Sequence, residues 1–192
     1  QANYGADSIT VLEGLEAVRV RPAMYIGDTG EGGLHELVKE IVNNSVDEAM
    51  VGSCTRIDVV IRTGGSVRVE DDGRGIPVDH HAGEGKSGLE VIMTILHAGG
   101  KFDKKAYQVS GGLHGVGSSV VNALSEWCVA EVHQNGKLHR QRYARGIPTS
   151  EVEIVGDSER TGTTIEFLPD TQIFETVAYN YETIAHRLRE LA

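Results

Sequence analysis

RIDVVIRTGGSVRVEDDGRGIP, at residues 56–77, is the segment of this chain that says most about its fold. Apolar and polar residues alternate at 56–62 and at 66–70, which predicts two strands, and TGG at 63–65 predicts a hairpin turn between them. Residues 71–77 follow the second strand and contain two glycines on either side of an arginine. The backbone there can turn sharply and approach a ligand closely. On this segment alone, a ligand-binding turn and an ordinary acidic turn are equally compatible with the sequence.

The rest of the chain also shows strands joined by hairpins, with helices grouped between them. Asn135-Gly136 is the strongest hairpin signal, because this pair favours the tight turn that antiparallel strands need. This arrangement favours an α+β two-layer sandwich over an alternating parallel sheet. No repeat or linker interrupts the chain, so we expect a single domain over residues 1–192. The predicted helices cover 9–18, 34–51, 88–97, 118–124 and 181–191, and the further strands cover 127–134, 137–145, 151–155 and 163–168.

The composition indicates a soluble globular protein of the cytoplasm. Hydrophobic residues make up 40% of the chain, enough for a core, and no apolar run is long enough to span a membrane. The N-terminus lacks the layout of a secretory signal, and Cys54 and Cys128 fit no zinc or disulfide pattern. The formal charge of −10, from 28 acidic and 18 basic side chains, repels phosphodiester backbones. We therefore do not expect this part of the protein to grip DNA.

The predicted helix at 34–51 carries a polar face within a mostly apolar segment. Glu40, Asn44 and then Asp47 and Glu48 follow at spacings of three or four, which places them on one side of the helix. A carboxylate and an amide there suit a Mg²⁺ ion held mostly by substrate phosphates, because Mg²⁺ keeps several waters and needs few protein oxygens. For this segment taken alone, a solvated helix face is the default alternative.

A glycine-rich run, GGLHGVG at 111–117, precedes the predicted helix at 118–124. Successive backbone N–H groups in such turns bind anions, and a helix N-terminus adds a favourable dipole. Lys101, after two glycines, would add a positive charge for the same phosphates. The run fits neither the dinucleotide fingerprint nor the P-loop pattern, and a flexible surface loop is the alternative. No histidine cluster or nucleophile set stands out elsewhere.

Five motifs in a fixed order are specific together, although each is weak alone: EIVNNSVDEA (40–49), DDGRGIP (71–77), LHAGGKF (96–102), SGGLHGVGSSVVNAL (110–124) and TGTTIEF (161–167). They resemble the N-terminal ATPase domains of bacterial type IIA topoisomerases, those of DNA gyrase B or its topoisomerase IV counterpart, over nearly the whole chain. RPAMYIGDT (21–29) favours this branch over the chaperones and histidine kinases of the same superfamily. The resemblance implies the GHKL (Bergerat) ATPase fold, in which a mixed, mostly antiparallel sheet carries helices on one face.

The resemblance also implies roles in binding and hydrolysing ATP. Glu40 is expected to be the general base that activates water, and Asn44 to be a ligand of Mg²⁺. Asp71 is expected to accept a hydrogen bond from the adenine amino group, helped by Thr163 through a bridging water. Gly75 is expected to let the backbone come close to the base.

Other residues are expected to enclose the nucleotide. Arg74 is expected to pair with Glu48 at the mouth of the site, and the arm at 1–9 to bring Tyr4 and Ile9 to the nucleotide of a dimer partner. A lid over roughly 98–117 is expected to cover the phosphates. The expected wall around the base is Ile41, Val69, Ile76, Pro77, Met93 and Ile165, and the expected phosphate contacts are Lys101, Leu113, His114, Gly115, Val116 and Gly117.

By the same resemblance, hydrolysis of Mg·ATP drives passage of one DNA duplex through another and negative supercoiling. The implied partners are DNA gyrase A in an A2B2 complex, a second copy of the chain once ATP binds, duplex DNA through other domains, and aminocoumarin inhibitors. No membrane partner is implied. We expect the chain to belong to a longer protein, because it carries no DNA-cleaving tyrosine domain. The alternatives are the ATPase part of topoisomerase IV and a nucleotide-gated dimerisation module with incidental turnover, although pure binding would need no carboxylate such as Glu40.

Four positions depart from the family's pattern. Glu36 stands where a second histidine often follows the one at position 35, so a like charge lies one helical turn before Glu40. Asn43 replaces an aspartate, and Gln108 replaces a lysine. Gln134 replaces an arginine at a position associated with aminocoumarin binding.

Overall fold

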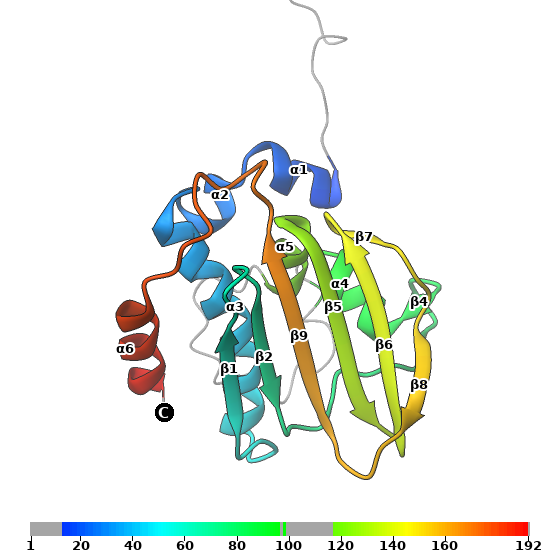
Figure 1. Cartoon of the computed structure of the whole chain (residues 1–192). Coiled ribbons are helices and arrows are strands. Elements are labelled where there is room, and N and C mark those ends of the chain that lie inside the picture. The colour runs from blue at the N-terminus through cyan, green and yellow to red at the C-terminus, as the bar shows by residue number, and fades with distance from the viewer. Residues whose placement is uncertain (1–12, 97, 99–116, 192) are drawn as a thin grey trace, which may run out of the picture.

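The computed structural model describes residues 13–96, 98 and 117–191. Its strands form one antiparallel sheet and a short two-stranded sheet beside it (Figure 1). Every pairing among the described strands is antiparallel, which confirms the expected α+β fold with a mostly antiparallel sheet. The strand order in the large sheet is β1 (Ile57–Ile61), β2 (Val67–Asp71), β9 (Gly162–Pro169), β5 (Ser125–Gln134), β6 (Lys137–Ala144) and β7 (Ile147–Pro148). Strand β8 (Glu153–Asp157) also pairs with β6. In the small sheet, β3 (His80–His81) pairs with β4 (Lys86–Ser87).

The helices lie close to their predicted positions. The long predicted helix is α3, which begins earlier than expected, at Glu31, and α4 ends at Thr94 because the next residue is extended. The part of the first predicted helix before residue 13 lies outside the described residues. Helix α2 and the strands β3, β4 and β7 were not predicted, since two to four residues show no periodicity. The helices are α1 (Gly14–Val20), α2 (Ala23–Ile26), α3 (Glu31–Met50), α4 (Gly88–Thr94), α5 (Gly117–Ala123) and α6 (Tyr181–Leu191).

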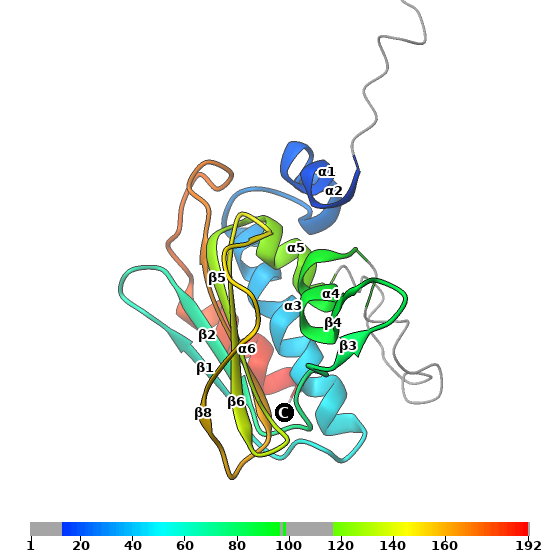
Figure 2. The ribbon, with the colours of Figure 1, turned by 90° about the vertical axis from the view of Figure 1, so that its right-hand side faces the viewer.

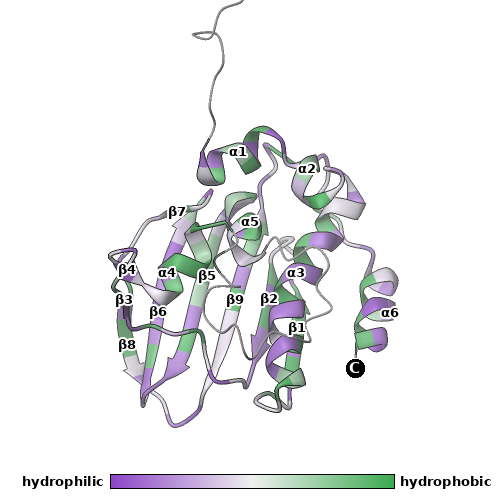
Figure 3. Ribbon diagram, turned by 180° about the vertical axis from the view of Figure 1, so that it is seen from behind, coloured by the Kyte–Doolittle hydropathy of each residue, from purple (hydrophilic) through white to green (hydrophobic). Residues whose placement is uncertain are grey.

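Helices α3, α4 and α5 cover one face of the sheet, and within the described residues no helix packs on the other face (Figures 1 and 2). Helix α6 lies beside the edge strand β1 (Figure 1). Seen from behind, the covering helices carry both polar and apolar residues (Figure 3). An amphipathic helix of this kind buries its apolar side and exposes the other. The apolar sides of these helices therefore face the sheet, and their polar sides face away from it.

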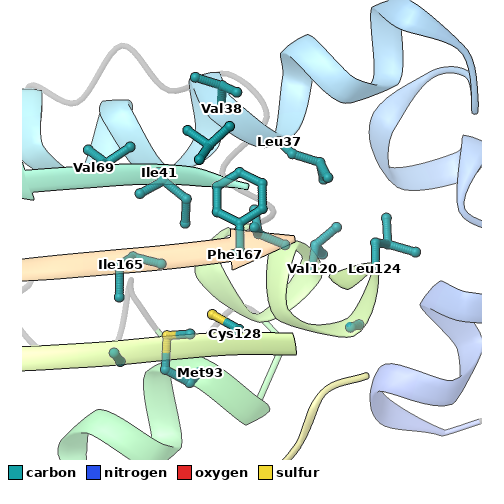
Figure 4. Packing of buried hydrophobic residues seen from close by; sticks show 14 of the residues in the cluster. Leu37, Val38, Ile41, Val69, Met93, Val120, Leu124, Cys128, Ile165 and Phe167 are labelled. Atoms are coloured by element: carbon teal, nitrogen blue, oxygen red, sulfur yellow. The ribbon is translucent and has the colours of Figure 1, made fainter. Parts of the chain in front are cut away.

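The core fills the space between the sheet and its three covering helices. Leu37, Val38 and Ile41 of α3 point toward Val69 and Phe167 of the sheet, and all are nearly or completely buried (Figure 4). Each such side chain contributes roughly 1.5–3 kcal/mol when removed from water. Both cysteines are also buried, and both are free.

A buried carboxylate fixes the first helix against the end of the sheet. Asp170 Oδ2 accepts hydrogen bonds from Arg19 Nη2 (2.9 Å) and Arg145 Nε (2.7 Å), and its side chain has no exposed surface. Arg19 Nη1 also donates to the carbonyl of Ala123 (2.8 Å). Burial opposes ionisation of Asp170, yet hydrogen bonds from Arg145, Gln172 and Arg19 lower its pKa below the ordinary value. This cluster joins α1, α5, β6 and β9.

Candidate functional site

The polar face of α3 meets the start of α5. Glu40 is buried, and its Oε2 accepts a hydrogen bond from the backbone N–H of Gly117 (3.2 Å). One turn later Asn44 lies at the surface and donates through Nδ2 to Ser118 Oγ (2.9 Å). This bond uses the amide nitrogen, so the amide oxygen of Asn44 is the atom suited to a cation. The structure thus brings Glu40, Asn44 and Gly117 together from two helices.

Asp71, at the end of β2, is a buried carboxylate with donors on both oxygens. Ser45 Oγ donates to Oδ2 (2.7 Å), and the backbone N–H groups of Gly73 (3.0 Å) and Thr163 (3.2 Å) donate to Oδ1. Burial raises the pKa of Asp71, and these three hydrogen bonds oppose that rise. The carboxylate is therefore fixed in orientation by α3, its own turn and β9.

Ser45 is a site residue that the sequence analysis missed. It is buried and follows Ile41 and Val42 in the apolar stripe of α3. A hydroxyl within a core stripe is the signal that would have revealed it, because buried hydroxyls need a partner.

Arg74 and Glu48 close one side of this region, as the resemblance implied. Arg74 Nη2 lies 2.8 Å from Glu48 Oε1, and both Nε (3.1 Å) and the backbone N–H (3.2 Å) of Arg74 donate to Oε2. The side-chain hydrogen bond from Arg74 lowers the pKa of Glu48, and burial partly opposes this effect. The fork geometry of arginine allows this two-point contact.

The turn after Asp71 depends on close backbone approach. Gly75 has φ +86°, and a Cβ there would lie 3.0 Å from Val132 Cγ1 and 3.1 Å from the carbonyl of His133. Gln134 Nε2 donates to the carbonyls of Arg74 (3.3 Å) and Gly75 (3.2 Å). These contacts hold the turn against β5.

Thr163 connects this turn to β9. Its Oγ1 accepts from the N–H of Ile76 (3.1 Å), while its own N–H donates to Asp71. The residue before it, Gly162, has φ +144°, and a Cβ there would lie 2.1 Å from the carbonyl oxygen of Asp71. Only glycine fits at this position without displacing β2.

Four residues of the expected apolar wall lie in the core between the helices and the sheet. Ile41, Val69, Met93 and Ile165 are at most 3% exposed and point into the space between helices and sheet (Figure 4). Ile76 packs against the same cluster, and Pro77 is exposed. Asn122 Nδ2 donates to the carbonyl of Met93 (2.8 Å) and so anchors α4 on α5. The wall is continuous with the core, so its shape is set by core packing.

Several expected site residues lie outside the described residues. These are Tyr4, Ile9, Lys101, Leu113, His114, Gly115 and Val116, together with Gln108. Glu36, in the place of the second histidine, forms an ion pair with Lys39 Nζ (3.1 Å). In the part of the chain that is described, no three His, Cys, Asp or Glu side chains converge as a metal cluster. No described helix is both long and apolar enough to cross a membrane.

Comparison with known proteins shows the family of this chain. Residues 29–173 match the family model described as histidine kinase-, DNA gyrase B-, and HSP90-like ATPase. The chain belongs to this ATPase family. DNA gyrase B of Campylobacter jejuni is 60% identical over 192 residues, which are 100% of this chain and 25% of that protein. That of Thermotoga maritima is 58% identical over 189 residues, which are 98% of this chain and 30% of that protein.

The solved structure of a related domain has the same fold as this chain. The 43K ATPase domain of Thermus thermophilus gyrase B, crystallised with an aminocoumarin, has a TM-score of 0.82 and 48% identity. The match covers 93% of this chain and 45% of that one. The chain spans only about a quarter to a third of the curated relatives, at 25% and 30% of their length.

The close approach of Gly162 to Asp71 gives a first prediction. Gly162→Ala should lower the free energy of unfolding by about 2–4 kcal/mol, because the new Cβ clashes with a backbone carbonyl at an unfavourable φ. Gly156→Ala is the matched control: no atom lies within 4 Å of a Cβ there, so we expect a change of about 0.5 kcal/mol or less. Urea denaturation of both variants measures the difference. Equal losses of unfolding free energy in the two variants would show that a side chain at position 162 is tolerated beside the carbonyl of Asp71.

Proposed function

We propose that this chain binds Mg·ATP and hydrolyses it as the ATPase domain of a DNA gyrase B protein. In the whole protein, hydrolysis would drive passage of one DNA duplex through another and negative supercoiling. The membership of the ATPase family and the gyrase relatives support this proposal. The whole protein would act in the cytoplasm, where bacterial DNA lies.

The observation that carries the proposal is the buried, oriented carboxylate of Asp71 beside an apolar wall. An adenine ring is flat and apolar on its faces and presents an amino donor at its edge. Ile41, Val69, Met93 and Ile165, which are buried in the core, would form the apolar wall for the ring, and the oxygens of Asp71 would accept from the amino group. Thr163 would add a bridging water, and Gly75, Ile76 and Pro77 would line the opposite edge of the base.

We propose Glu40 as the general base. Its carboxylate lies against Gly117, the last residue of the glycine-rich run that would hold the phosphates. A water between Glu40 and the terminal phosphate would give up its proton to the carboxylate as it attacks. Phosphoryl transfer depends mainly on positioning and charge stabilisation by the protein, which Glu40 and the residues around Gly117 would supply.

Asn44 and its neighbours fit a Mg²⁺ ion that is bound mainly through phosphates. The amide oxygen of Asn44 is a hard ligand, and Glu40 adds negative charge one turn away. Because no larger carboxylate cluster occurs in the described residues, most of the remaining ligands would be phosphate oxygens and water. The bound ion would neutralise charge on the phosphates.

The remaining features are proposals of the same kind. Residues 1–192 would form one domain, with an arm at 1–9 that carries Tyr4 and Ile9 to a second copy. A lid at about 98–117 would bring Lys101 and the backbone at 113–117 to the phosphates. DNA gyrase A in an A2B2 complex and duplex DNA would bind through other parts of the whole protein.

The adenine contact is tested by Asp71→Ala. Loss of a hydrogen bond to a charged acceptor costs roughly 1.5–3 kcal/mol, so ATP affinity should fall by about ten- to a hundredfold. Asp72→Ala is the matched control, since the Asp72 carboxylate instead accepts from Thr55 and Arg56 at the surface. Calorimetric titration of both variants with ATP and GTP gives the measurement. If the Asp71 variant keeps its affinity and its preference for adenine, the base binds elsewhere.

The general base is tested by Glu40→Ala in the whole protein. Turnover should fall by about 10²–10⁴-fold while ATP binding persists, because general bases typically contribute this factor. Glu36→Ala removes a carboxylate from the preceding turn, where it pairs with Lys39, and should leave turnover within a few-fold. Single-turnover hydrolysis and nucleotide binding are both measured. Turnover near that of the unsubstituted protein would remove Glu40 from this role.

Inhibitor binding is tested at position 134. The Thermus gyrase domain was crystallised with an aminocoumarin, and we propose that this chain binds the same class. Gln134 offers only a neutral amide, already engaged with the carbonyls of Arg74 and Gly75, whereas arginine offers a charged fork. Gln134→Arg should therefore bind an aminocoumarin more tightly by calorimetry. Equal affinities would mean that this position does not contribute.

A further inference from the structure

Arg160, in the loop between β8 and β9, joins the two strands that lie on either side of β9 (Figure 1). Its Nη1 donates to Glu70 Oε1 of β2, and its Nη2 lies 2.9 Å from Nε2 of His133 in β5. Since β9 lies between β2 and β5 in the sheet, the arginine reaches across the start of β9. The loop that carries Arg160 is thereby fastened to both neighbours of β9.

The contact between Arg160 and His133 needs a neutral imidazole. An arginine side chain has only N–H donors, so Nε2 of His133 is the acceptor. The proton of the neutral ring is then on Nδ1, which donates to Ser158 Oγ (2.7 Å). A protonated ring would place a second N–H and a like charge against the guanidinium. The contact with Arg160 would then be lost.

The charges around His133 do not balance a positive imidazole. On β2, Glu70 already accepts from Arg160 and pairs with Arg68 (2.5 Å). On β5 itself, Glu131 already pairs with an arginine of β6 (2.6 Å). Burial and the charge of Arg160 lower the pKa of His133 below its ordinary value, and Glu131 and Glu70 oppose this effect only in part. His133 is therefore neutral at neutral pH.

The other neighbours of His133 in the sheet do not change this balance. Leu138 on β6 and Gly162 on β9 lie opposite His133 and carry no charge. Lys137, the residue before Leu138, pairs with Asp157 of β8 (2.5 Å). A proton on His133 would thus add a cation to a region where Arg68 and Arg160 already share one carboxylate.

The start of β9 is also part of the proposed adenine site. A Cβ on Gly162 would lie 2.1 Å from the carbonyl oxygen of Asp71, so the two backbones are in close contact. The N–H of Thr163 donates to Asp71 Oδ1 (3.2 Å), and Thr163 Oγ1 accepts from the N–H of Ile76 (3.1 Å). Because these contacts are so close, a shift at the start of β9 would displace the groups that orient Asp71.

We propose that Arg160 is a positioning residue for the adenine site and that it holds Gly162 and Thr163 in place only while His133 is neutral. This inference rests on the proposed binding of ATP beside Asp71. Glu70 precedes Asp71 in β2 and so points to the opposite face of the sheet. Arg160 therefore acts from behind the site, through the backbone of β9. Acidification weakens ATP binding through this contact.

The sign of the pH effect follows from the direction of the pKa shift. Because folding lowers the pKa of His133, the unfolded chain takes up the proton first as the pH falls below the ordinary value of about 6.5. The free energy of unfolding then falls with pH and levels off below the folded pKa of His133. Above the ordinary value, the contribution of the neutral ring is fully present.

His133→Gln tests the proposal, because the amide oxygen of glutamine accepts from Arg160 and does not titrate. The variant and the unsubstituted chain should bind Mg·ATP equally at about pH 7.5, where histidine is neutral. At about pH 5 the unsubstituted chain should bind about three- to tenfold more weakly than the variant, the factor for one lost hydrogen bond. ATP titrates alike in both experiments, so the ratio of the two dissociation constants isolates His133. His186→Gln, at an exposed position of α6, is the control and should follow the unsubstituted chain.

Arg160→Gln tests the arginine itself. This variant should bind Mg·ATP about three- to tenfold more weakly already at neutral pH. Adding His133→Gln to it should change the affinity at about pH 5 by less than about twofold, since the two residues act through one contact. Arg62→Gln is the matched control, because Arg62 pairs with Glu166 outside this cluster, and it should leave ATP affinity unchanged.

Urea unfolding without nucleotide separates this proposal from the proposed function. The urea midpoints of the unsubstituted chain and His133→Gln should diverge below about pH 6.5, with the variant more resistant. Diverging midpoints in a chain that binds no ATP at any pH would contradict the proposed function. Equal midpoints, equal ATP binding at about pH 5, or unchanged ATP binding in Arg160→Gln would each overturn the role given to Arg160 and His133.

Discussion

The carboxylate of Asp71 is buried at the point where the helix layer meets the sheet. Removing a carboxylate from water is costly unless its oxygens are satisfied, and here one donor comes from Ser45 on α3, one from Gly73 in the turn and one from Thr163 on β9. Each donor reaches the carboxylate of Asp71 only if the helix, turn or strand that carries it is in the observed position. The position of α3 over the sheet, the turn and the register of β2 with β9 are therefore coupled through this one group.

The same constraint explains why the site is built with glycines. Gly162 lets β9 come against the carbonyl of Asp71, and Gly75 lets the turn come against β5. Side chains at either position would push apart the strands that hold Asp71 and Thr163. The adenine side of the proposed site is thus rigid because its backbone is close-packed, while the opposite face of the same strands carries charged pairs at the surface.

Two of the residues that depart from the family's pattern, Glu36 and Gln134, form specific contacts in the structure. Glu36 pairs with Lys39, so its charge is balanced by a neighbour one turn along α3. Gln134 supports the carbonyls of Arg74 and Gly75, a role that an arginine, with its charged fork, would perform differently. Gln134 thus supports the backbone of the turn, whereas Glu36 forms a side-chain ion pair within its own helix.

Local pattern was enough to predict most elements, because helices and hairpins depend on residues close in sequence. The strands around Asn135-Gly136, the long α3 and the five ordered motifs all followed from such patterns, and so did the assignment to the ATPase family. The insertion of β9 between β2 and β5 could not be predicted in this way, nor could Ser45 as a partner of Asp71 or the joining of Arg19 and Arg145 on Asp170. These contacts link residues far apart along the chain, so only the packing of helices on the sheet determines them.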